Sequence, residues 1–248
     1  MVLVPTLTWN ASTTSSPHQA LGPFYDLREL VLAAMLAALA GAAGAAAWLY
    51  TSGWYVTFMT GNTERLVLEH FKGEHVIAFG ALATVLVFVA GVITATLARV
   101  YLWRKARHGA TRVMTAATIA ACLSDMFLVA EGDAFGVAPV MCLAFGLGAL
   151  NTSISRRGEV VMPLSYMTGT LVKIGQGIAL HVASIRRWGW VPHATTISGF
   201  VAGAVLGGAL FSNTGTHHSL LALAAISLII SVATWFLDHH GFIADDVY

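Results

Sequence analysis

The stretch Phe58-Met59-Thr60-Gly61 is repeated 108 residues later as Tyr166-Met167-Thr168-Gly169. In both copies an aromatic residue precedes a Met-Thr-Gly triplet, and a cation follows the Gly by four residues, as Arg65 and as Lys173. Each copy comes after one long apolar span and before two more. A short, polar, Gly-containing segment that is repeated within a membrane protein is a common place for a binding site.

The composition is that of a membrane protein. Of the 248 residues, 57% are hydrophobic and 10% are charged, whereas soluble domains have about 25% charged residues. The net charge of +1 gives no reason to expect nucleic-acid binding. No zinc-protease, phosphate-loop or serine-hydrolase motif is found, and Cys122 and Cys142 are expected to be small residues within apolar spans. The sequence therefore predicts no catalytic residue, no metal and no cofactor.

Six apolar spans are close to the roughly 20 residues that cross a bilayer as a helix. They are Leu30–Tyr50, Val76–Ala98, Val113–Ala130, Ala134–Ile154, Ala194–Phe211 and Leu220–Leu237. They lack the alternation of apolar and polar residues that a β-barrel needs, so helices are predicted. Small residues recur at every fourth position, as in Gly199, Gly203 and Gly207, and predict faces on which two helices pack closely.

Two further helices are predicted to start at the repeated triplets, over Thr60–Lys72 and Thr168–Ile185. The first is too charged to cross lipid, because it contains Glu64, Glu69 and His70 among other polar residues. We expect both to be half-helices that enter the protein part-way and return to the side they came from. For the second, a full span is the alternative, since it is nearly long enough.

Arginine and lysine predict the orientation, because they are retained on the cytoplasmic side. The link between the second and third spans contains Arg99, Arg104, Lys105, Arg107 and Arg112. The other segments that should share its side carry Arg28, Arg156, Arg157, Arg186 and Arg187. Both termini are then cytoplasmic. This arrangement requires both half-helices to return to their own side, so the charge bias supports the re-entrant interpretation independently of the repeat.

An odd number of spans in each repeat forces the second copy to insert upside down. The predicted fold class is an all-α membrane protein with six transmembrane helices, arranged as two inverted three-helix repeats that each contain a re-entrant half-helix. Repeat 1 is expected over residues 28–131 and repeat 2 over residues 132–239. Residues 1–27 are expected to be a flexible cytoplasmic tail, and residues 240–248 a second cytoplasmic tail.

The starts of the two half-helices form the candidate binding site. A helix start presents unpaired N–H groups and about half a positive charge. Two such ends that meet near the membrane midplane would attract an anion or a dipole. The substrate-binding residues predicted there are Thr60, Gly61, Asn62, Thr168, Gly169 and Thr170. The alternative is that the Thr and Asn side chains only cap the helices.

Four polar residues near these starts complete the predicted substrate site. Arg65 and Lys173, one turn further along, are predicted to hold an anionic substrate. The alternatives are an ion pair of Arg65 with Glu69, and a Lys173 side chain that reaches the membrane interface. Asn151 could hydrogen-bond the second motif, with a simple helix end as the alternative. Gln176 could line a path for the solute.

Asp125 is the only acidic residue within the six spans. A carboxylate in a membrane span is costly unless it is paired or protonated, so Asp125 is predicted to couple transport to a proton or a cation. The alternative is that it merely reaches water, because Glu131 follows it closely along the chain.

Four blocks of the sequence are similar to those of a known family: Phe58–Thr63, Gly148–Thr152, Gly158–Val160 and Tyr166–Gln176. With them the chain resembles the YoaK-type family of bacterial integral membrane proteins, a domain of unknown function. The resemblance implies a multi-helix protein of the bacterial inner membrane and implies no substrate. Members often carry an acid in a Gly-x-x-Asp-Ala pattern within the first span, where this chain reads Gly41-Ala42-Ala43-Gly44-Ala45.

The predicted function is a membrane channel or a secondary transporter for a small polar or anionic solute, bound between the facing half-helix N-termini. One alternative is a membrane-embedded enzyme that acts on lipid or quinone, and another is a membrane scaffold or sensor that transports nothing. The expected partners are the lipid bilayer and the solute, without nucleic acid. The sequence leaves the oligomeric state open, a homo-oligomer included.

Overall fold

The computed structural model describes residues 27–51, 53–103, 109–128, 137–156, 159–160, 162, 164–185 and 187–239. The expected tails, residues 1–27 and 240–248, lie outside the described residues except for Leu27. The same holds for residues 104–108 and 129–136, which belong to two of the links between helices.

The described residues form eight helices and one very short hairpin. The helices are α1 (Leu27–Thr51), α2 (Met59–Phe71), α3 (His75–Tyr101), α4 (Ala110–Leu128), α5 (Val137–Leu150), α6 (Met167–Val182), α7 (Val191–Thr214) and α8 (Thr216–His239). The hairpin pairs β1 (Ser155–Arg156) with β2 (Glu159–Val160), antiparallel, between α5 and α6. The helical class predicted from the sequence is therefore confirmed.

Four of the described helices, α1, α3, α7 and α8, are long and apolar enough to cross a membrane. The helix α5 is apolar but has only 14 residues. The predicted span Ala134–Ile154 was too long at its C-terminal end, because the helix ends at Leu150. There the Asn151 side chain donates a hydrogen bond to the Leu147 carbonyl, 2.8 Å away, and the chain turns toward the hairpin.

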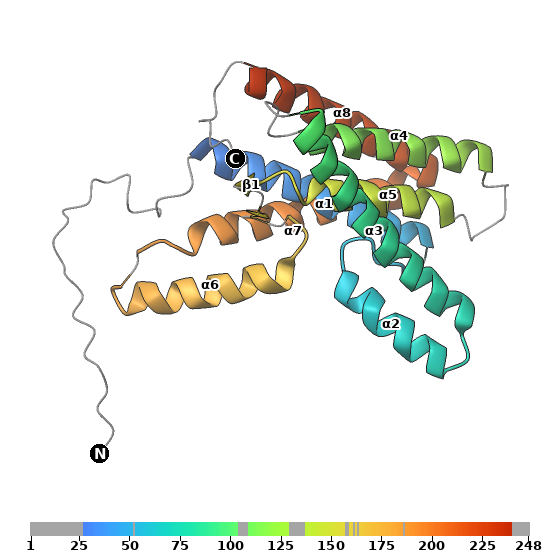
Figure 1. Ribbon diagram of the computed structural model, residues 1–248, viewed down its shortest axis with the longest axis horizontal. Helices are drawn as coiled ribbons and strands as arrows, with labels where there is room; N and C mark the ends of the chain where they lie inside the picture. Colours follow the sequence, from blue (N-terminus) through green and yellow to red (C-terminus); the bar gives the residue numbers. More distant parts are fainter. Residues whose placement is uncertain are drawn as a thin grey trace.

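The helix α1 lies along α7, and α3 crosses α5 (Figure 1). The small residues predicted to form packing faces make these contacts. A Cβ atom at Gly203 would overlap the Ala38 carbonyl of α1, and one at Gly91 would overlap the Phe145 carbonyl of α5. The backbones can approach this closely only because no side chain stands between them, which gains dispersion contacts in a lipid environment.

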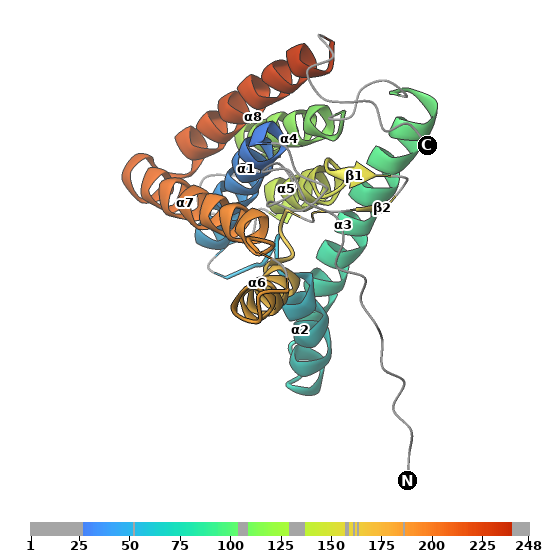
Figure 2. The same cartoon turned by 90° about the vertical axis from the view of Figure 1, so that its left-hand side faces the viewer.

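The helices α4 and α8 meet through buried hydroxyl groups instead. The Oγ1 atoms of Thr111 and Thr234 are 3.0 Å apart, and Thr115 Oγ1 is 3.0 Å from Ser227 Oγ. Each hydroxyl group is thus hydrogen-bonded to another within an apolar environment, where an unpaired polar group would be costly. Figure 2, turned from the first view, shows α1 between α8 and α7 with α4 beside it.

The core of the molecule is formed around α1 and α5, where Leu36, Leu143 and Leu147 are fully or almost fully buried. The outward faces of α3, α7 and α8 leave large apolar side chains uncovered. Phe79 is 65% exposed and Leu206 is 70% exposed. An apolar surface of this kind fits contact with lipid, because a soluble protein seldom exposes large apolar patches.

Candidate functional site

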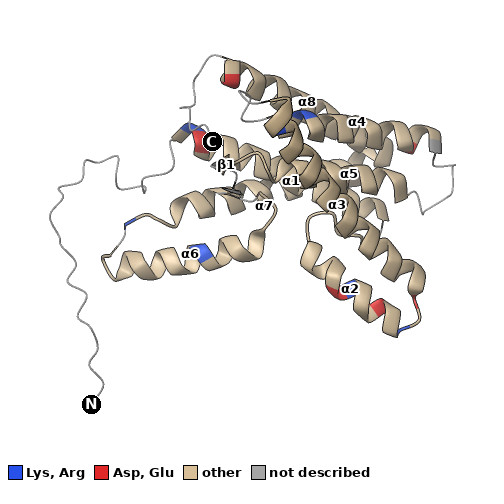
Figure 3. Ribbon diagram, in the orientation of Figure 1, with Lys and Arg blue, Asp and Glu red and all other residues tan. Residues whose placement is uncertain are grey.

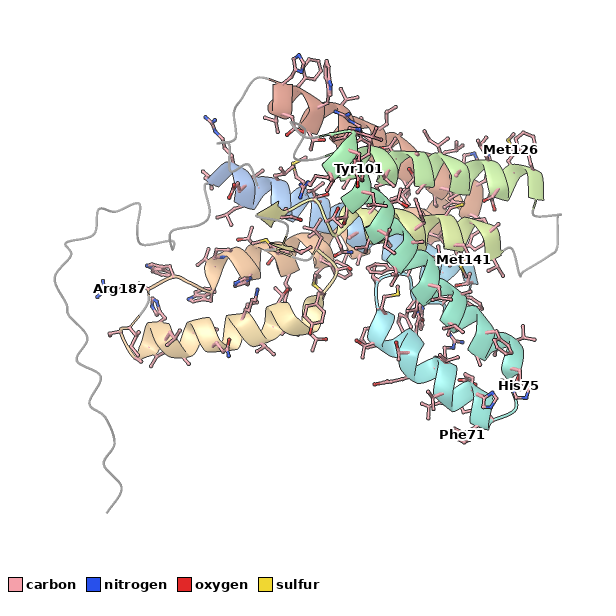
Figure 4. All side chains as sticks on the ribbon, in the orientation of Figure 1. Phe71, His75, Tyr101, Met126, Met141 and Arg187 are labelled. Carbon is pink, nitrogen blue, oxygen red and sulfur yellow. The ribbon has the colours of Figure 1, made fainter. Side chains whose placement is uncertain are left out.

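The two copies of the repeated triplet border one cavity. This cavity has a volume of about 440 Å³ and includes Met59 and Thr60 from the start of α2. Met167 and Thr168 from the start of α6 line it as well. From this point the two helices extend in opposite directions (Figure 1). Figure 4 shows Phe71 at the far end of α2 and Arg187 just past α6, on opposite sides of the molecule.

Aromatic rings surround the cavity on several sides: Tyr55, Phe58, Phe88, Tyr166 and Phe200. The lining also contains Thr57, Thr60, Thr152, Ser165 and Thr168, although most of its surface is apolar and the hydroxyls of Thr152 and Ser165 are bonded to Ala149 and Asn151. Among the described residues that line this cavity there is no carboxylate, amine, guanidinium or imidazole. The space is therefore suited to a small uncharged polar group or to an anion whose charge is met by backbone N–H groups.

Glycine in the triplet is required by the aromatic residue three positions before it. A Cβ atom at Gly61 would overlap the ring of Phe58, and one at Gly169 would overlap the ring of Tyr166. In both copies the ring thus folds back over the first turn of its own helix. This contact explains why the aromatic residue and the glycine occur together in both copies, which sequence alone left unexplained.

Neither helix start is capped by a side chain. The N-cap residues are Phe58 and Tyr166, and neither makes a side-chain cap hydrogen bond. Backbone hydrogen bonding within α2 starts with Asn62 N–H to the Phe58 carbonyl at 3.1 Å, and within α6 with Thr170 N–H to the Tyr166 carbonyl at 3.2 Å. The N–H groups of the first turns are thus not satisfied by capping side chains, and they carry the positive end of each helix dipole.

Asn62 and Thr170 occupy equivalent positions and face away from the cavity. Asn62 is 2% exposed and donates from Nδ2 to the Tyr55 carbonyl at 2.7 Å. Thr170 is buried and donates from Oγ1 to the Tyr166 carbonyl at 2.9 Å. Asn62 thus holds the turn before α2, whereas Thr170 bonds the N-cap residue of its own helix; neither lines the cavity, which does include Thr60 and Thr168.

Asn151 connects the end of α5 to the chain before the second triplet. Its Oδ1 accepts from the Ser165 backbone N–H at 2.9 Å, and its Nδ2 donates to Ser165 Oγ at 2.8 Å. Both residues line the cavity. The hydrogen bond that the sequence suggested between Asn151 and the second motif is therefore made two residues before Met167.

The two predicted cations lie outside the cavity lining. Arg65 donates from Nη1 to the Gly53 carbonyl at 2.8 Å, which ties α2 to the loop before it. The alternative pair of Arg65 with Glu69 is not formed, because Glu69 pairs with Lys72 at 3.1 Å. Lys173 is exposed on α6. Figure 3 shows several charged residues along α2 and a single cation within α6.

Gln176 is exposed on the same helix as Lys173 and does not line the cavity. The charged and amide side chains of α6 thus lie beyond its first turn. Their predicted contact with a solute stays a prediction, because it would require the solute to move along the outside of α6.

Asp125 is held by two partners that the sequence did not suggest. Its Oδ1 accepts from the Tyr50 hydroxyl at 2.9 Å, and its Oδ2 is 3.2 Å from Nδ1 of His217. The carboxylate side chain is 12% exposed. These contacts join the end of α1, the end of α4 and the start of α8. They satisfy the acid that a membrane span would otherwise disfavour.

The model of the family described as "Protein of unknown function (DUF1275)" matches residues 32–233. The chain belongs to this family. The resemblance to the YoaK-type membrane proteins, drawn from the sequence blocks around both triplets, is confirmed by this match.

A relative of this DUF1275 chain is a UPF0700 transmembrane protein from Rhizobium meliloti (strain 1021). It is 30% identical over 73 residues, which are 29% of this chain and 32% of that relative. The matched part thus spans about a third of the length of the curated relative. No solved structure matches the chain. Together with its long apolar helices, these similarities make the DUF1275 chain a multi-pass membrane protein.

Proposed function

We propose that this chain is a membrane channel or secondary transporter for a small polar or anionic solute, which binds in the cavity between α2 and α6. The observation that carries the proposal is that two helix N-termini without side-chain caps border the same cavity. Two partial positive charges directed at one space attract an anion or the negative end of a dipole. The hydroxyls of Thr60 and Thr168 add donors and acceptors at the same place.

We further propose that the fold is an inverted repeat with six spans. Several cavity-lining positions pair at the repeat offset of 108 residues: Thr57 with Ser165, Phe58 with Tyr166, Met59 with Met167, Thr60 with Thr168 and Val92 with Phe200. Helix contacts pair in the same way, because α1 on α7 corresponds to α5 on α3, and α2 on α3 corresponds to α6 on α7. A cavity lined by equivalent residues of both halves lies where a pseudo-two-fold axis would pass.

In this proposal α2 and α6 are re-entrant half-helices from opposite sides of the bacterial inner membrane. Support comes from Figure 1, where the two helices point away from each other, and from the basic residues of the sequence. The ends of α3 and α5, and the starts of α1, α4 and α7, then face the cytoplasm with their arginines. Both chain termini share that side.

Asp125 is the group that we propose for coupling to protons or cations. Its pairing with Tyr50 and His217 gives it a neighbour that can gain or lose a proton. Substitution Asp125→Asn is expected to abolish uptake driven by an imposed pH gradient while solute exchange continues. Equal gradient-driven uptake in this variant and in the unchanged protein would remove Asp125 from the proposal.

Flux assays in proteoliposomes test the proposal. The panel contains formate, acetate, nitrate, urea and glycerol, and the variants are Thr60→Val and Thr168→Val. Loss of one hydrogen bond, worth about 1 kcal/mol, is expected to reduce uptake of the transported solute about fivefold. Thr63→Val is the matched control, since Thr63 is exposed on α2 and donates only to the Met59 carbonyl. Unchanged uptake in both cavity variants, or no uptake above empty liposomes for the whole panel, would refute it.

A further inference from the structure

A separate apolar groove lies between α3, α4 and α5, away from the cavity between the triplets. It has a volume of about 590 Å³ and is lined mainly by aliphatic and aromatic side chains, among them Val87, Ala116, Met141 and Phe145. Volumes of this size hold small organic ligands. Because Ala116 is exposed at the surface of the described bundle, the groove can be entered sideways from the membrane.

One end of the groove carries a cation and an indole ring. Arg112, in the first turn of α4, places its guanidinium 5.7 Å from the centroid of the Trp103 ring. Both residues line the groove. Among the described residues no carboxylate pairs with Arg112. A guanidinium that no described acid neutralises, beside an aromatic ring and at the end of an apolar groove, matches an anionic group attached to an apolar chain.

The molecule contains a natural comparison for this groove. A cavity of about 590 Å³ also lies between α1, α7 and α8, which correspond to α5, α3 and α4 in the repeat, although its lining residues are not at the positions equivalent to those of the first groove. Met35, Leu206 and Ile226 line it, and its described lining contains no arginine or lysine. Two grooves of equal size thus differ in charge. An acyl chain alone would fit both, whereas an anionic headgroup is met only at Arg112.

The cation also lies next to a basic stretch of the sequence. Arg112 follows the link between α3 and α4, where the sequence contains Arg104, Lys105 and Arg107. At the other end of the same helix, near Met126 (Figure 4), Asp125 is the charged residue. Basic pockets between membrane helices on the cytoplasmic side are suited to anionic lipid headgroups.

We propose that the groove between α3, α4 and α5 binds an anionic glycerophospholipid of the cytoplasmic leaflet. The phosphate of the headgroup lies on the Arg112 guanidinium, which can donate two parallel hydrogen bonds to it. Trp103 lies at the level of the headgroup, and one acyl chain runs along Ala116 toward Met141. This site does not depend on the proposed transport function, because it shares no lining residue with the cavity between α2 and α6.

Native mass spectrometry of the purified full chain, titrated with phosphatidylglycerol or phosphatidylcholine, tests the lipid site. The unchanged protein is expected to retain phosphatidylglycerol preferentially. Arg112→Gln is expected to reduce that preference about tenfold, because the guanidinium favours the net negative headgroup of phosphatidylglycerol over that of phosphatidylcholine, whose choline ammonium offsets its phosphate. Arg112→Lys keeps the charge without the two parallel hydrogen bonds and is expected to keep part of the preference. Retained phosphatidylcholine binding by Arg112→Gln shows that this variant is folded.

Two bulky substitutions locate the lipid. Ala116→Phe fills the groove from an exposed position and is expected to remove the retained phosphatidylglycerol. Ile226→Phe, in the cavity between α1, α7 and α8 that has no arginine or lysine in its described lining, is expected to leave it bound. Undiminished preference in Arg112→Gln would overturn the proposal, as would equal effects of the two phenylalanine variants. Displacement of phosphatidylglycerol by inorganic phosphate, with Ala116→Phe without effect, would show an anion site instead and would equally overturn it.

Discussion

At the scale of single residues, the repeated motif is a contact between an aromatic ring and a helix backbone. Phe58 and Tyr166 fold over Gly61 and Gly169, and both glycines are needed for the close approach of the ring. Neither glycine has the positive φ that would require glycine for conformational reasons. The motif thereby places an aromatic wall directly beside a helix start without a side-chain cap.

Gly169→Ala is expected to be less stable than Gly175→Ala by about 0.5–1.5 kcal/mol, because the new methyl group overlaps the exposed Tyr166 ring and moves it from its rotamer. Thermal unfolding in detergent measures the effect. Gly175→Ala on the same helix meets nothing within 4 Å and is the matched control, expected to be neutral or stabilising by about 0.5–1 kcal/mol. The double variant Tyr166→Ala/Gly169→Ala should recover the loss caused by Gly169→Ala. If it does not, the ring is not what the glycine accommodates.

Asn151→Ala removes every side-chain hydrogen bond between the end of α5 and Ser165. Since the residue is buried and Ser165 would lose its partner, the expected cost is about 1–3 kcal/mol. Chemical denaturation measures the free energy of unfolding of this variant and of the matched control Asn213→Ala. Asn213 is exposed and its side chain bonds only the Ala209 carbonyl of its own helix. Equal stability of the two variants would mean that Asn151 does not hold the segment before α6.

At the scale of helices, the close contacts use glycine and alanine, and the sequence made these faces predictable. Glycine recurs every fourth residue in α7, and Gly203 of this series lies against Ala38 of α1, as the spacing indicated. The presence of the long helices was also predictable from the sequence, because an apolar segment long enough to cross lipid must satisfy its own backbone hydrogen bonds as a helix. The residue at which α5 ends could not be predicted in this way. At this end the Asn151 side chain donates a hydrogen bond to the Leu147 carbonyl, and the number of apolar residues gives no sign of such a bond.

The candidate site was predictable only in part. The triplets identified Thr60 and Thr168 because repetition is visible in sequence. The partner of Arg65 is a backbone carbonyl, that of Gly53, and no residue type signals such an acceptor. The partners of Asp125 were missed because they come from the ends of two distant helices. The repeat offset, applied to Thr57 and Val92, would have found Ser165 and Phe200 as further cavity residues.

A test at this scale compares two glycines of α7. Gly203→Ala places a methyl group into the Ala38 backbone and is expected to destabilise the contact of α1 with α7 by about 1–3 kcal/mol or more. Gly208→Ala on the same helix meets nothing within 4 Å, so it should be tolerated. Unfolding in detergent separates the two. Similar stability of both variants would show that α1 and α7 do not depend on backbone contact.

At the scale of the whole molecule, the halves differ in what they expose although their helices correspond. The helix α2 carries several acids and bases, whereas α6 carries a lysine and no acid (Figure 3). Of the two apolar cavities of similar volume, one between α3, α4 and α5 has an arginine, and the other between α1, α7 and α8 has none in its described lining. In an inverted repeat, equivalent parts of the two halves would face opposite leaflets. Because basic residues are retained on the cytoplasmic side, equivalent positions of the two halves are then expected to differ in charge.

Opposite entry of α2 and α6 can be measured by labelling single cysteines with a membrane-impermeant maleimide, in a chain where Cys122 and Cys142 are replaced by alanine. Phe71→Cys, 83% exposed at the end of α2, should react only from the periplasmic side. Val182→Cys, 78% exposed at the end of α6, should react only in inverted vesicles. Tyr101→Cys, at the end of α3, is the control for the cytoplasmic side, because that helix end leads into the basic link.

These three positions separate the re-entrant arrangement from its alternative. If α6 crossed the whole membrane, Val182 would lie on the side opposite to Tyr101, and all later helix ends would change sides as well. Val182→Cys would then be labelled from the same side as Phe71→Cys. Labelling of both half-helix ends from one side would therefore end the proposal of facing N-termini at the midplane. Labelling of Val182→Cys and Tyr101→Cys from the same side would mean that α6 returns to the side from which it entered. This is the orientation in which both uncapped helix starts reach one cavity from opposite leaflets.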